Sequence, residues 1–520
     1  MWFFSLFVAF VLIPFLIHLN KTYHVLAFFP KRIRNVNGEN VERILPTLPG
    51  TTIFGNTFDT LGLDFVQTFK FFRHNAAIMK TSYVTYMGGK TLLNVIDADL
   101  AEMIMTNTKL ITKGFFYKFI QPALGEGLLI SAGEKWFGRR KMLTPAFHFN
   151  ILMQFQEIFK EESLKFVKQL QNSEGEEIEL DKHTQKFSLD VICETALGVK
   201  FDECLNGEQY RKNIYVFEES FNKRSQYPYL WNDFVYKTLE EYKYRPALKI
   251  VHDFSSDIIK KKRQIFTQEF QSGQTHEEQI YQKKRYAMLD TLLRAEQEGL
   301  IDHAGICEEV DTFTFEGFDT ASMSLMFCLM NLSLYPEMQQ RCYEEILEEI
   351  NPDLSTLDIA QLNKLKYLDC FFKESMRMYS TVPLVMRTAV EETQLPNGLI
   401  LPANSSIMLH IFDLHRNPKY FAKPDVFNPD RFLPENSVGR HPYAFVPFSA
   451  GQRNCIGQKY TMLEMKTLVV FILKSFKILP AVNPETLQFK SGIIIRTKND
   501  VKAKFIKRPI FGYPSPRVYM

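Results

Sequence analysis

The stretch PFSAGQRNCIGQKY, residues 447–460, constrains this chain more than any other. It places one cysteine, Cys455, between Gly451 and Gly457 and close to the cation Arg453. Closely packed backbone amides and a nearby cation favour a thiolate, and glycines let a large flat group approach the backbone. The stretch therefore predicts a cysteine that acts as a ligand rather than as a packing residue.

Two other interpretations of Cys455 stay open from the residues alone. The cysteine could be a buried structural residue in a glycine turn, or a nucleophile paired with a distant histidine. No recognised nucleophile motif surrounds it, and no pair of histidines has zinc-site spacing with cysteines. The GGKT sequence at residues 88–91 is not a phosphate-binding loop, because Val84 stands where the first glycine is needed.

The seven cysteines of the chain indicate its redox environment. They are odd in number and scattered, without a Cys-x-x-Cys pair, so they do not form a disulfide framework. We therefore expect the body of the chain in a reducing compartment. The net charge of +3 gives no electrostatic footprint for nucleic acid, and no nucleic-acid partner is expected.

The N-terminal segment differs from the rest of the chain. Residues 2–19 contain no Asp, Glu, Lys or Arg and are about long enough to span a bilayer. Basic residues follow, and positive flanks favour the cytosolic side. A buried core helix is the alternative. We expect a transmembrane signal anchor at residues 1–20, then a basic Pro/Gly hinge at residues 21–56.

The remaining chain, residues 57–520, has mainly helical periodicity. Apolar residues recur at three- and four-residue spacing over residues 151–171 and 336–350. Short β-like runs occur at residues 82–96 and 491–497. Because no internal repeat or linker divides this part, it predicts one large domain that is mainly α with small β-sheets.

The pattern Phe448-x-x-Gly451-x-Arg453-x-Cys455-x-Gly457 resembles the haem-thiolate signature of the cytochrome P-450 superfamily. Other motifs occur in the order of that superfamily between residues 136 and 457. The resemblance implies the cytochrome P-450 fold, a single large helical domain behind the membrane anchor. It also implies haem b as cofactor, with Cys455 as the axial ligand of the iron.

These other motifs supply expected cofactor and structural residues. Trp136 and Arg140, at i and i+4, present an indole donor and a guanidinium that can hold carboxylates such as haem propionates. The resemblance implies that Arg387 also reaches a propionate and that Arg453 contributes to cofactor binding. It further implies a structural triad of charges. The triad consists of Glu374, Arg377 and Arg431.

Residues 308–324, EEVDTFTFEGFDTASMS, are expected to form the helix on the oxygen side of the haem. On a helix, five of these residues would lie on one face: Phe313, Glu316, Gly317, Thr320 and Ser324. Gly317 removes a side chain where dioxygen must fit. Asp319 and Thr320 supply an acid and a hydroxyl that can pass protons, and are the expected catalytic residues.

The same stretch resembles family four of these cytochromes, the branch known for fatty-acid ω-hydroxylation, and the surrounding sequence is most similar to insect members. Thr314, Phe318 and Ala321 depart from the family pattern. In family-four relatives the glutamate that matches Glu316 forms an ester with a haem methyl, and we expect that here. The substrate channel is expected to be walled by apolar stretches. These are residues 113–124, 382–386 and 492–495, with Phe315 and Phe318.

The resemblance implies a haem-thiolate monooxygenase that inserts one oxygen atom of O₂ into a C–H bond of a lipophilic substrate. Fatty-acid ω-hydroxylation is favoured, and hormone metabolism or detoxification of foreign compounds is the alternative. A peroxide-rearranging enzyme and a non-catalytic haem sensor are rivals. Only 65 residues follow Cys455, too few for a flavin domain. Electrons are therefore expected from outside the chain. The resemblance implies NADPH–cytochrome reductase and cytochrome b5 as partners, at the cytosolic face of the endoplasmic reticulum membrane.

Overall fold

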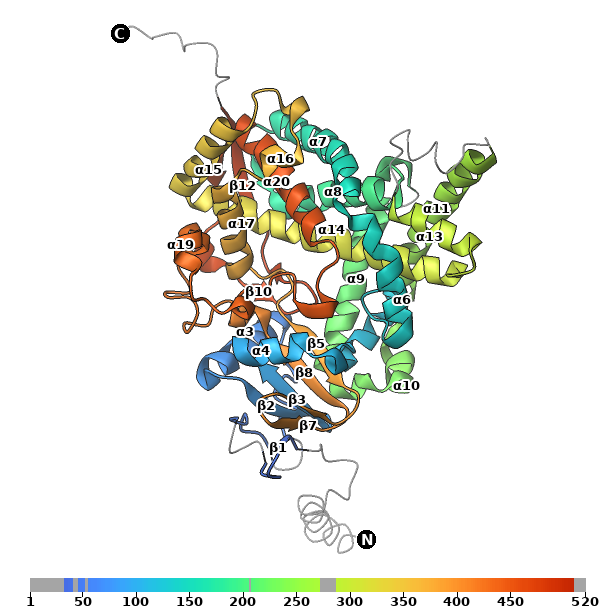
Figure 1. The fold of residues 1–520 in the computed structure, drawn as a ribbon, viewed down its shortest axis with the longest axis vertical. Helices are drawn as coiled ribbons and strands as arrows, with labels where there is room; N and C mark the ends of the chain where they lie inside the picture. Colours follow the sequence, from blue (N-terminus) through green and yellow to red (C-terminus); the bar gives the residue numbers. More distant parts are fainter. Residues whose placement is uncertain (1–31, 41–44, 52–54, 205–206, 272–286, 509–520) are drawn as a thin grey trace, which may run out of the picture.

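The computed structural model describes residues 32–40, 45–51, 55–204, 207–271 and 287–508. Figure 1 shows a helical region at one end and a four-stranded β-sheet towards the other, with helix α14 (His303–Leu334) crossing the centre. The predicted anchor at residues 1–20 lies outside the described residues. Within the described ranges, no helix combines the length and apolar composition needed to cross a lipid bilayer.

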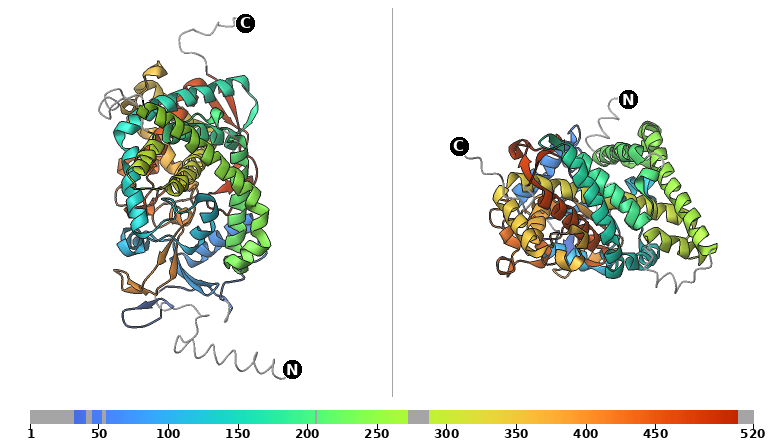
Figure 2. Two further views of the ribbon diagram at one scale, coloured as in Figure 1. Left: turned by 90° about the vertical axis from the view of Figure 1, so that its right-hand side faces the viewer. Right: turned by 90° about the horizontal axis from the view of Figure 1, so that it is seen from above.

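The helices carry most of the described chain, as the sequence predicts. The expected helices at residues 151–171 and 336–350 are α7 (Phe149–Asn172) and α15 (Pro336–Glu349). The other long helices are α3 (Phe65–Met79), α6 (Gly133–Leu143), α8 (Leu180–Ile192), α9 (Gly207–Gln226), α11 (Tyr242–Gln271), α13 (Met288–Gln297), α17 (Lys366–Met378) and α20 (Gln458–Ser475). Shorter helices are α4 (Ala98–Thr106), α5 (Gln121–Leu124), α10 (Asp233–Tyr236), α16 (Ile359–Leu362), α18 (Ile411–Leu414) and α19 (Pro434–Ser437). Figure 2 shows α9, α11 and α13, in green and yellow-green, along one side of the molecule.

The strands form small sheets. The largest has the order β2-β3-β8-β5, in which β3 and β8 are parallel and the other pairs antiparallel. Its strands are β2 (Tyr83–Met87), β3 (Lys90–Val95), β8 (Ser405–Leu409) and β5 (Val385–Ala389). The smaller sheets contain β1 (Arg34–Asn35), β7 (Leu399–Leu401) and β6 (Thr393–Gln394); β4 (Glu177–Glu179), β12 (Lys502–Lys507) and β9 (Phe476–Pro480); and β10 (Phe489–Lys490) with β11 (Arg496–Thr497).

Helix α14 forms the centre of the core. It begins after Asp302, whose carboxylate accepts a hydrogen bond from the Gly305 N–H at 2.8 Å, and it ends before Pro336, which disfavours helical backbone in the residue ahead of it. Leu325, Met326 and successive residues of this helix are fully buried, so α14 is covered on all sides. A helix placed in this way can hold side chains at a fixed depth inside the protein.

The second expected β run is largely a connection rather than a strand. Only Arg496 and Thr497, of residues 491–497, pair as strand β11. The Ser491 N–H donates to the Phe65 carbonyl at 2.9 Å and the Ile495 N–H donates to the Thr381 carbonyl at 2.8 Å. Because other parts of the chain satisfy these backbone groups, the apolar residues between them pass over the interior without forming a sheet.

A buried ion pair links helix α17 to the segment that carries Cys455. Arg377 donates to both Glu374 oxygens, at 2.7 and 2.9 Å, and both side chains are fully buried. Arg377 also donates to the His415 carbonyl at 3.0 Å. The His415 ring accepts a hydrogen bond from the Val446 N–H at 2.8 Å, and burial lowers the pKa of His415 to about 3, which keeps the ring neutral. Arg431, the third member of the expected triad, lies 3.4 Å from Glu374.

Candidate active site

The loop before α20 holds Cys455 in a defined backbone geometry. The Cys455 N–H donates to the Phe448 carbonyl at 2.9 Å, and α20 begins three residues later. Gly451 has φ +70°, and a Cβ there would lie 1.9 Å from the Met105 carbonyl oxygen. Gly451 therefore permits close packing against α4 and does not open space for a ligand, contrary to expectation. Gly457 does border the ligand space, with a Cβ position 3.9 Å from the Cys455 sulfur.

A cavity of about 1570 Å³ lies between the Cys455 loop and α14. The five residues expected to share one helical face all line it. These are Phe313, Glu316, Gly317, Thr320 and Ser324. Cys455 is accessible because it faces this internal space. The structure therefore brings together the cysteine and the helix face that the sequence placed more than 130 residues apart.

Buried cations gather at one edge of the cavity. Arg453 donates to the carbonyls of Ile111 and Leu128, at 2.9 and 3.2 Å, and its guanidinium lies 4.2 Å from the centroid of the Trp136 ring. Arg140 donates to the Asn454 carbonyl and side-chain oxygen, at 2.9 and 2.7 Å. These partners are all uncharged, so they orient the guanidinium groups without neutralising them.

The charges that line the cavity are unbalanced. Lys113, Arg140 and Arg453 line it, and Glu316 is the only acidic residue among the described lining residues. Burial, with the guanidinium groups of Arg387 and Arg453, holds the pKa of Lys113 well below its usual range. Burial, with Arg387 and Arg140, lowers the pKa of Arg453 to about 9. A ligand with two negative charges would relieve this strain, and the two propionates of a haem fit that requirement.

Arg387, expected to reach a propionate, is buried and is not among the residues that line the cavity. Its backbone forms an antiparallel β-bridge with Lys113, and its guanidinium donates to the Met386 carbonyl. Lys113 lines the cavity and was missed as a cofactor residue. In the sequence it stands only as the first residue of the expected channel wall at residues 113–124, with no specific signal for cofactor binding.

The protein alone does not favour a Cys455 thiolate. Burial raises the pKa of Cys455 to about 11; Glu316 adds to the rise, and Arg140 and Lys113 oppose it. Arg453, expected to stabilise the thiolate, instead directs its donors to backbone carbonyls. A metal ion bound to the sulfur would be needed to hold the thiolate, because a coordinating thiol loses its proton outright.

The acid and the hydroxyl of α14 point in different directions. Thr320 lines the cavity and its hydroxyl donates to the Glu316 carbonyl at 2.8 Å. Asp319 lies outside the lining residues, fully buried and paired with Arg496 at 2.6 Å. Burial raises the pKa of Asp319 to about 6, against the lowering effect of Arg496. Of this pair, only Thr320 is at the cavity wall.

The helix face also corrects the expected channel walls. Phe315 and Phe318 do not line the cavity, and Phe318 packs near the Tyr210 ring at 6.1 Å instead. A Cβ at Gly317 would lie 2.6 Å from the Ile192 side chain. Gly317 therefore lets α8 pack closely on α14, a contact that the local sequence does not reveal.

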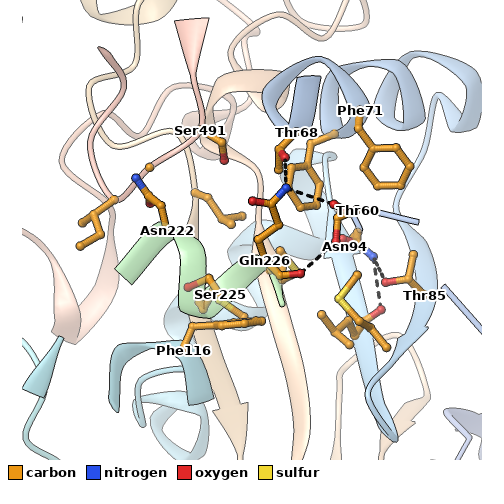
Figure 3. Close-up of a pocket in the computed structure, with 18 of the residues that line it drawn as sticks. Thr60, Thr68, Phe71, Thr85, Asn94, Phe116, Asn222, Ser225, Gln226 and Ser491 are labelled. Atoms are coloured by element: carbon orange, nitrogen blue, oxygen red, sulfur yellow. Dashed lines mark hydrogen bonds between the residues drawn. The ribbon is translucent and has the colours of Figure 1, made fainter. Parts of the chain in front are cut away.

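A second cavity, of about 1190 Å³, adjoins the first (Figure 3). Tyr117, Val382 and Ile493 line both cavities, and the three apolar stretches expected to form channel walls all contribute. We call the space beside Cys455 the inner cavity and this second space the outer cavity. The two cavities adjoin at these shared residues, and we call the outer cavity with this junction the apolar passage.

Comparison with known proteins decides the family. The family model described as Cytochrome P450 matches residues 45–505 of this sequence. The chain belongs to the cytochrome P450 family. Cytochrome P450 enzymes are haem-dependent monooxygenases, so this P450 is an oxidoreductase that uses haem. The unbalanced cations of the inner cavity fit a haem, whose two propionates would neutralise them.

Relatives support the assignment. This P450 is 52% identical over 492 residues to cytochrome P450 4p1 of Drosophila melanogaster, covering 94% of this chain and 96% of the relative. It is 37% identical over 429 residues to cytochrome P450 4V2 of Mus musculus, covering 81% and 82%. A solved haem domain of a cytochrome P450DA mutant shares the fold, with a TM-score of 0.74 at 20% identity over 89% of this chain and 98% of that one.

Replacing Gly317 with alanine should destabilise the protein by about 1–3 kcal/mol, because the new methyl group overlaps the Ile192 side chain. The Gly317→Ala and Ile192→Ala double variant should cost less than the sum of the single changes. Denaturant unfolding of the haem-loaded proteins measures this. Gly138→Ala, in α6 with no atom within 4 Å of the new Cβ, is the control and should not destabilise. Simple additivity of the two changes would contradict the packing role of Gly317.

Proposed function

We propose that this P450 hydroxylates the terminal carbon of a medium- or long-chain fatty acid or a related lipid. The observation that carries this proposal is the apolar passage, the mostly apolar outer cavity that adjoins the inner cavity, which suits an extended alkyl chain. Terminal C–H bonds are harder to break than internal ones, so the enzyme must present only the chain end to the reacting centre. An apolar passage that leads to a haem in the inner cavity would provide such a constraint.

Several residues would hold the haem in the inner cavity. Cys455 would bind the iron from the α20 side, and Trp136, Arg140, Lys113 and Arg453 would hold the propionates. The bound haem supplies oxygen activation at its iron, which a thiolate ligand promotes by donating electron density. The protein residues hold the cofactor in place, exclude water and present the substrate.

Proton supply would depend on α14. The Thr320 hydroxyl is at the cavity wall and can hold a water molecule or pass a proton. Asp319 is tied to Arg496 and accepts from the Tyr215 hydroxyl at 3.4 Å, so its carboxyl contributes only when this contact opens. Thr320 would therefore be the group in direct contact with the cavity, and Asp319 an acid that acts only after it separates from Arg496.

We also propose the cellular setting implied by the sequence. Residues 1–20 would anchor the protein in the endoplasmic reticulum membrane, with the catalytic domain on the cytosolic face. Electrons would come from NADPH through a separate reductase, with cytochrome b5 as a second donor. Consumption of NADPH by the reconstituted enzyme with reductase would distinguish a monooxygenase from a haem sensor or a peroxide-rearranging enzyme.

Replacing Cys455 with serine should abolish the red-shifted Soret band of the reduced carbon-monoxide complex, together with hydroxylation. A serine oxygen donates far less electron density to iron than a thiolate does. Cys307→Ser, which changes a partly exposed cysteine outside the cavity, is the matched control and should retain both. A retained band in the Cys455 variant would mean that another residue binds the iron.

Glu316 should form an ester with a haem methyl. It lines the inner cavity, and burial raises its pKa to about 7, so esterification would remove a costly charge. Joining a carboxylate oxygen to a methyl carbon releases a proton and two electrons, an oxidation that the enzyme's own oxygen chemistry supplies. Haem should therefore stay with the wild-type protein during acid chromatography and elute freely from Glu316→Gln.

Glu308→Gln is the control for this experiment, because Glu308 lies on the same helix, outside the cavity and paired with Lys135. Its haem should remain attached as in the wild type. Free elution of all haem from active wild-type protein would overturn the ester.

Product analysis with fatty acids and related lipids of several chain lengths tests the proposed regiochemistry. Hydroxyl groups should appear mainly on the terminal carbon, because the passage restricts which carbon reaches the haem. Oxidation at internal carbons alone would contradict the proposal. Turnover of bulky foreign compounds without turnover of any lipid would favour detoxification by the same chemistry.

A further inference from the structure

The residues that line the outer cavity are all uncharged. None of the described residues that line it is acidic, basic or a histidine. Its polar side chains are amides, hydroxyls and phenols, carried by α3, α9 and the β10–β11 connection among other elements (Figure 3). A lipid that occupies this space therefore meets hydrogen-bonding groups but no counter-ion.

Some of these polar groups have unused hydrogen-bonding capacity. Asn75 is only 6% exposed, lines the outer cavity and makes no side-chain hydrogen bond within the described part of the chain. Asn222 and Ser491 likewise line the cavity without a side-chain partner among the described residues. These amide and hydroxyl groups are therefore available to form hydrogen bonds with a polar ligand group.

Gln226 presents an acceptor to the same space. Its amide nitrogen donates to the Thr60 carbonyl at 3.1 Å, to the Thr68 hydroxyl at 3.2 Å and to the Leu63 carbonyl. Figure 3 shows the Gln226 amide oxygen on the side away from Thr68. The amide N–H groups of Gln226 are therefore already hydrogen-bonded, and its amide oxygen remains as an acceptor for a ligand.

The charges near the outer cavity disfavour an anion. Glu218 is 4% exposed, and its Oε1 has no hydrogen-bond partner and lies 3.0 Å from the position of a Cβ on Gly492, which lines the cavity. The nearby cation Arg496 is paired with Glu218 and Asp319, at 2.8 and 2.6 Å. On α3, Arg73 is paired with Asp413 at 2.8 Å. Two guanidinium nitrogens of Arg73 have no hydrogen-bond partner, but neither Arg73 nor any other cation is among the described residues that line the cavity.

We propose that the outer cavity binds the polar end of the substrate and that this end is uncharged, such as the hydroxyl of a long-chain alcohol or the carbonyl of an ester. Such a group can accept from Asn75, Asn222 or Ser491, and a hydroxyl can donate to Gln226. A carboxylate would lose its water, find no cation and face the Glu218 carboxylate. This inference rests on the proposed lipid hydroxylation and restricts its substrate class to neutral lipids in preference to free fatty acids.

The test compares dodecanol, methyl dodecanoate and dodecanoate as ligands of the haem-loaded, full-length protein. Dissociation constants come from the substrate-induced change of the Soret band. The two neutral lipids should bind at least about tenfold more tightly than the carboxylate, because burying an unpaired charge is costly. Equal or tighter binding of dodecanoate would overturn the inference.

A variant separates the head-group effect from general lipophilicity. Asn222→Lys places a cation at the polar wall and should shift the ratio of the alcohol and acid dissociation constants by at least about tenfold towards the acid. Glu219→Lys, on the exposed face of the same helix and outside the cavity lining, is the control and should leave the ratio unchanged. An unchanged ratio in a haem-loaded Asn222→Lys protein would also overturn the inference.

Product analysis keeps this test distinct from that of the proposed function. Tighter binding of the neutral lipids with oxidation at internal carbons would overturn terminal hydroxylation and support the uncharged polar end. Terminal hydroxylation with preference for dodecanoate would do the reverse. Absence of binding by all three lipids would overturn both.

Discussion

The buried ion pair between Glu374 and Arg377 is the interaction on which the active site depends. Both side chains are fully buried, and breaking such a pair by removing one partner costs about 3–5 kcal/mol. Arg377 also holds the His415 carbonyl, and the neutral His415 ring accepts from the Val446 N–H, directly before the loop that carries Cys455. The loop that holds Cys455 is thus tied to the core through three successive contacts.

The inner cavity is electrostatically incomplete without its cofactor. Lys113, Arg140 and Arg453 line this cavity, and burial lowers the pKa of Lys113 and of Arg453. Glu316 is the only acidic residue among the described lining residues. The thiol of Cys455 is likewise disfavoured from ionising until a metal ion binds. Burying these cations without counter-ions destabilises the folded protein, and a cofactor with two negative charges would offset this cost. Haem binding should therefore stabilise the fold.

The two cavities differ in the side chains that line them. The inner cavity carries the charges and the helix face of α14, whereas the outer cavity is apolar with neutral hydrogen-bonding groups. Arg496 lines neither cavity and pairs with Glu218 on α9 and Asp319 on α14. Its charge is therefore neutralised by these two carboxylates, and Asp319 stays outside the lining of the inner cavity.

Local patterns of the sequence were enough for the main features. Helical spacing alone placed Glu316, Gly317 and Thr320 on one face, and the structure has them on the cavity wall, because a helix fixes the direction of its own side chains. The cysteine motif and the mainly helical fold were likewise predictable, since both depend on short-range sequence. Residues 1–20, an expected anchor, lie outside the described part of the chain.

Contacts between distant segments were not predictable. Gly451 and Gly457 have different structural roles. Met105, about 350 residues earlier in the chain, packs against Gly451, whereas Gly457 borders the inner cavity. Lys113 rather than Arg387 reaches the inner cavity, and Phe318 faces Tyr210, because strand and helix packing decides which side of each element is covered. The sequence by itself determined most of the helices, the family and the class of reaction. Only the tertiary structure decided which charges are neutralised, because that depends on groups brought together from distant parts of the chain.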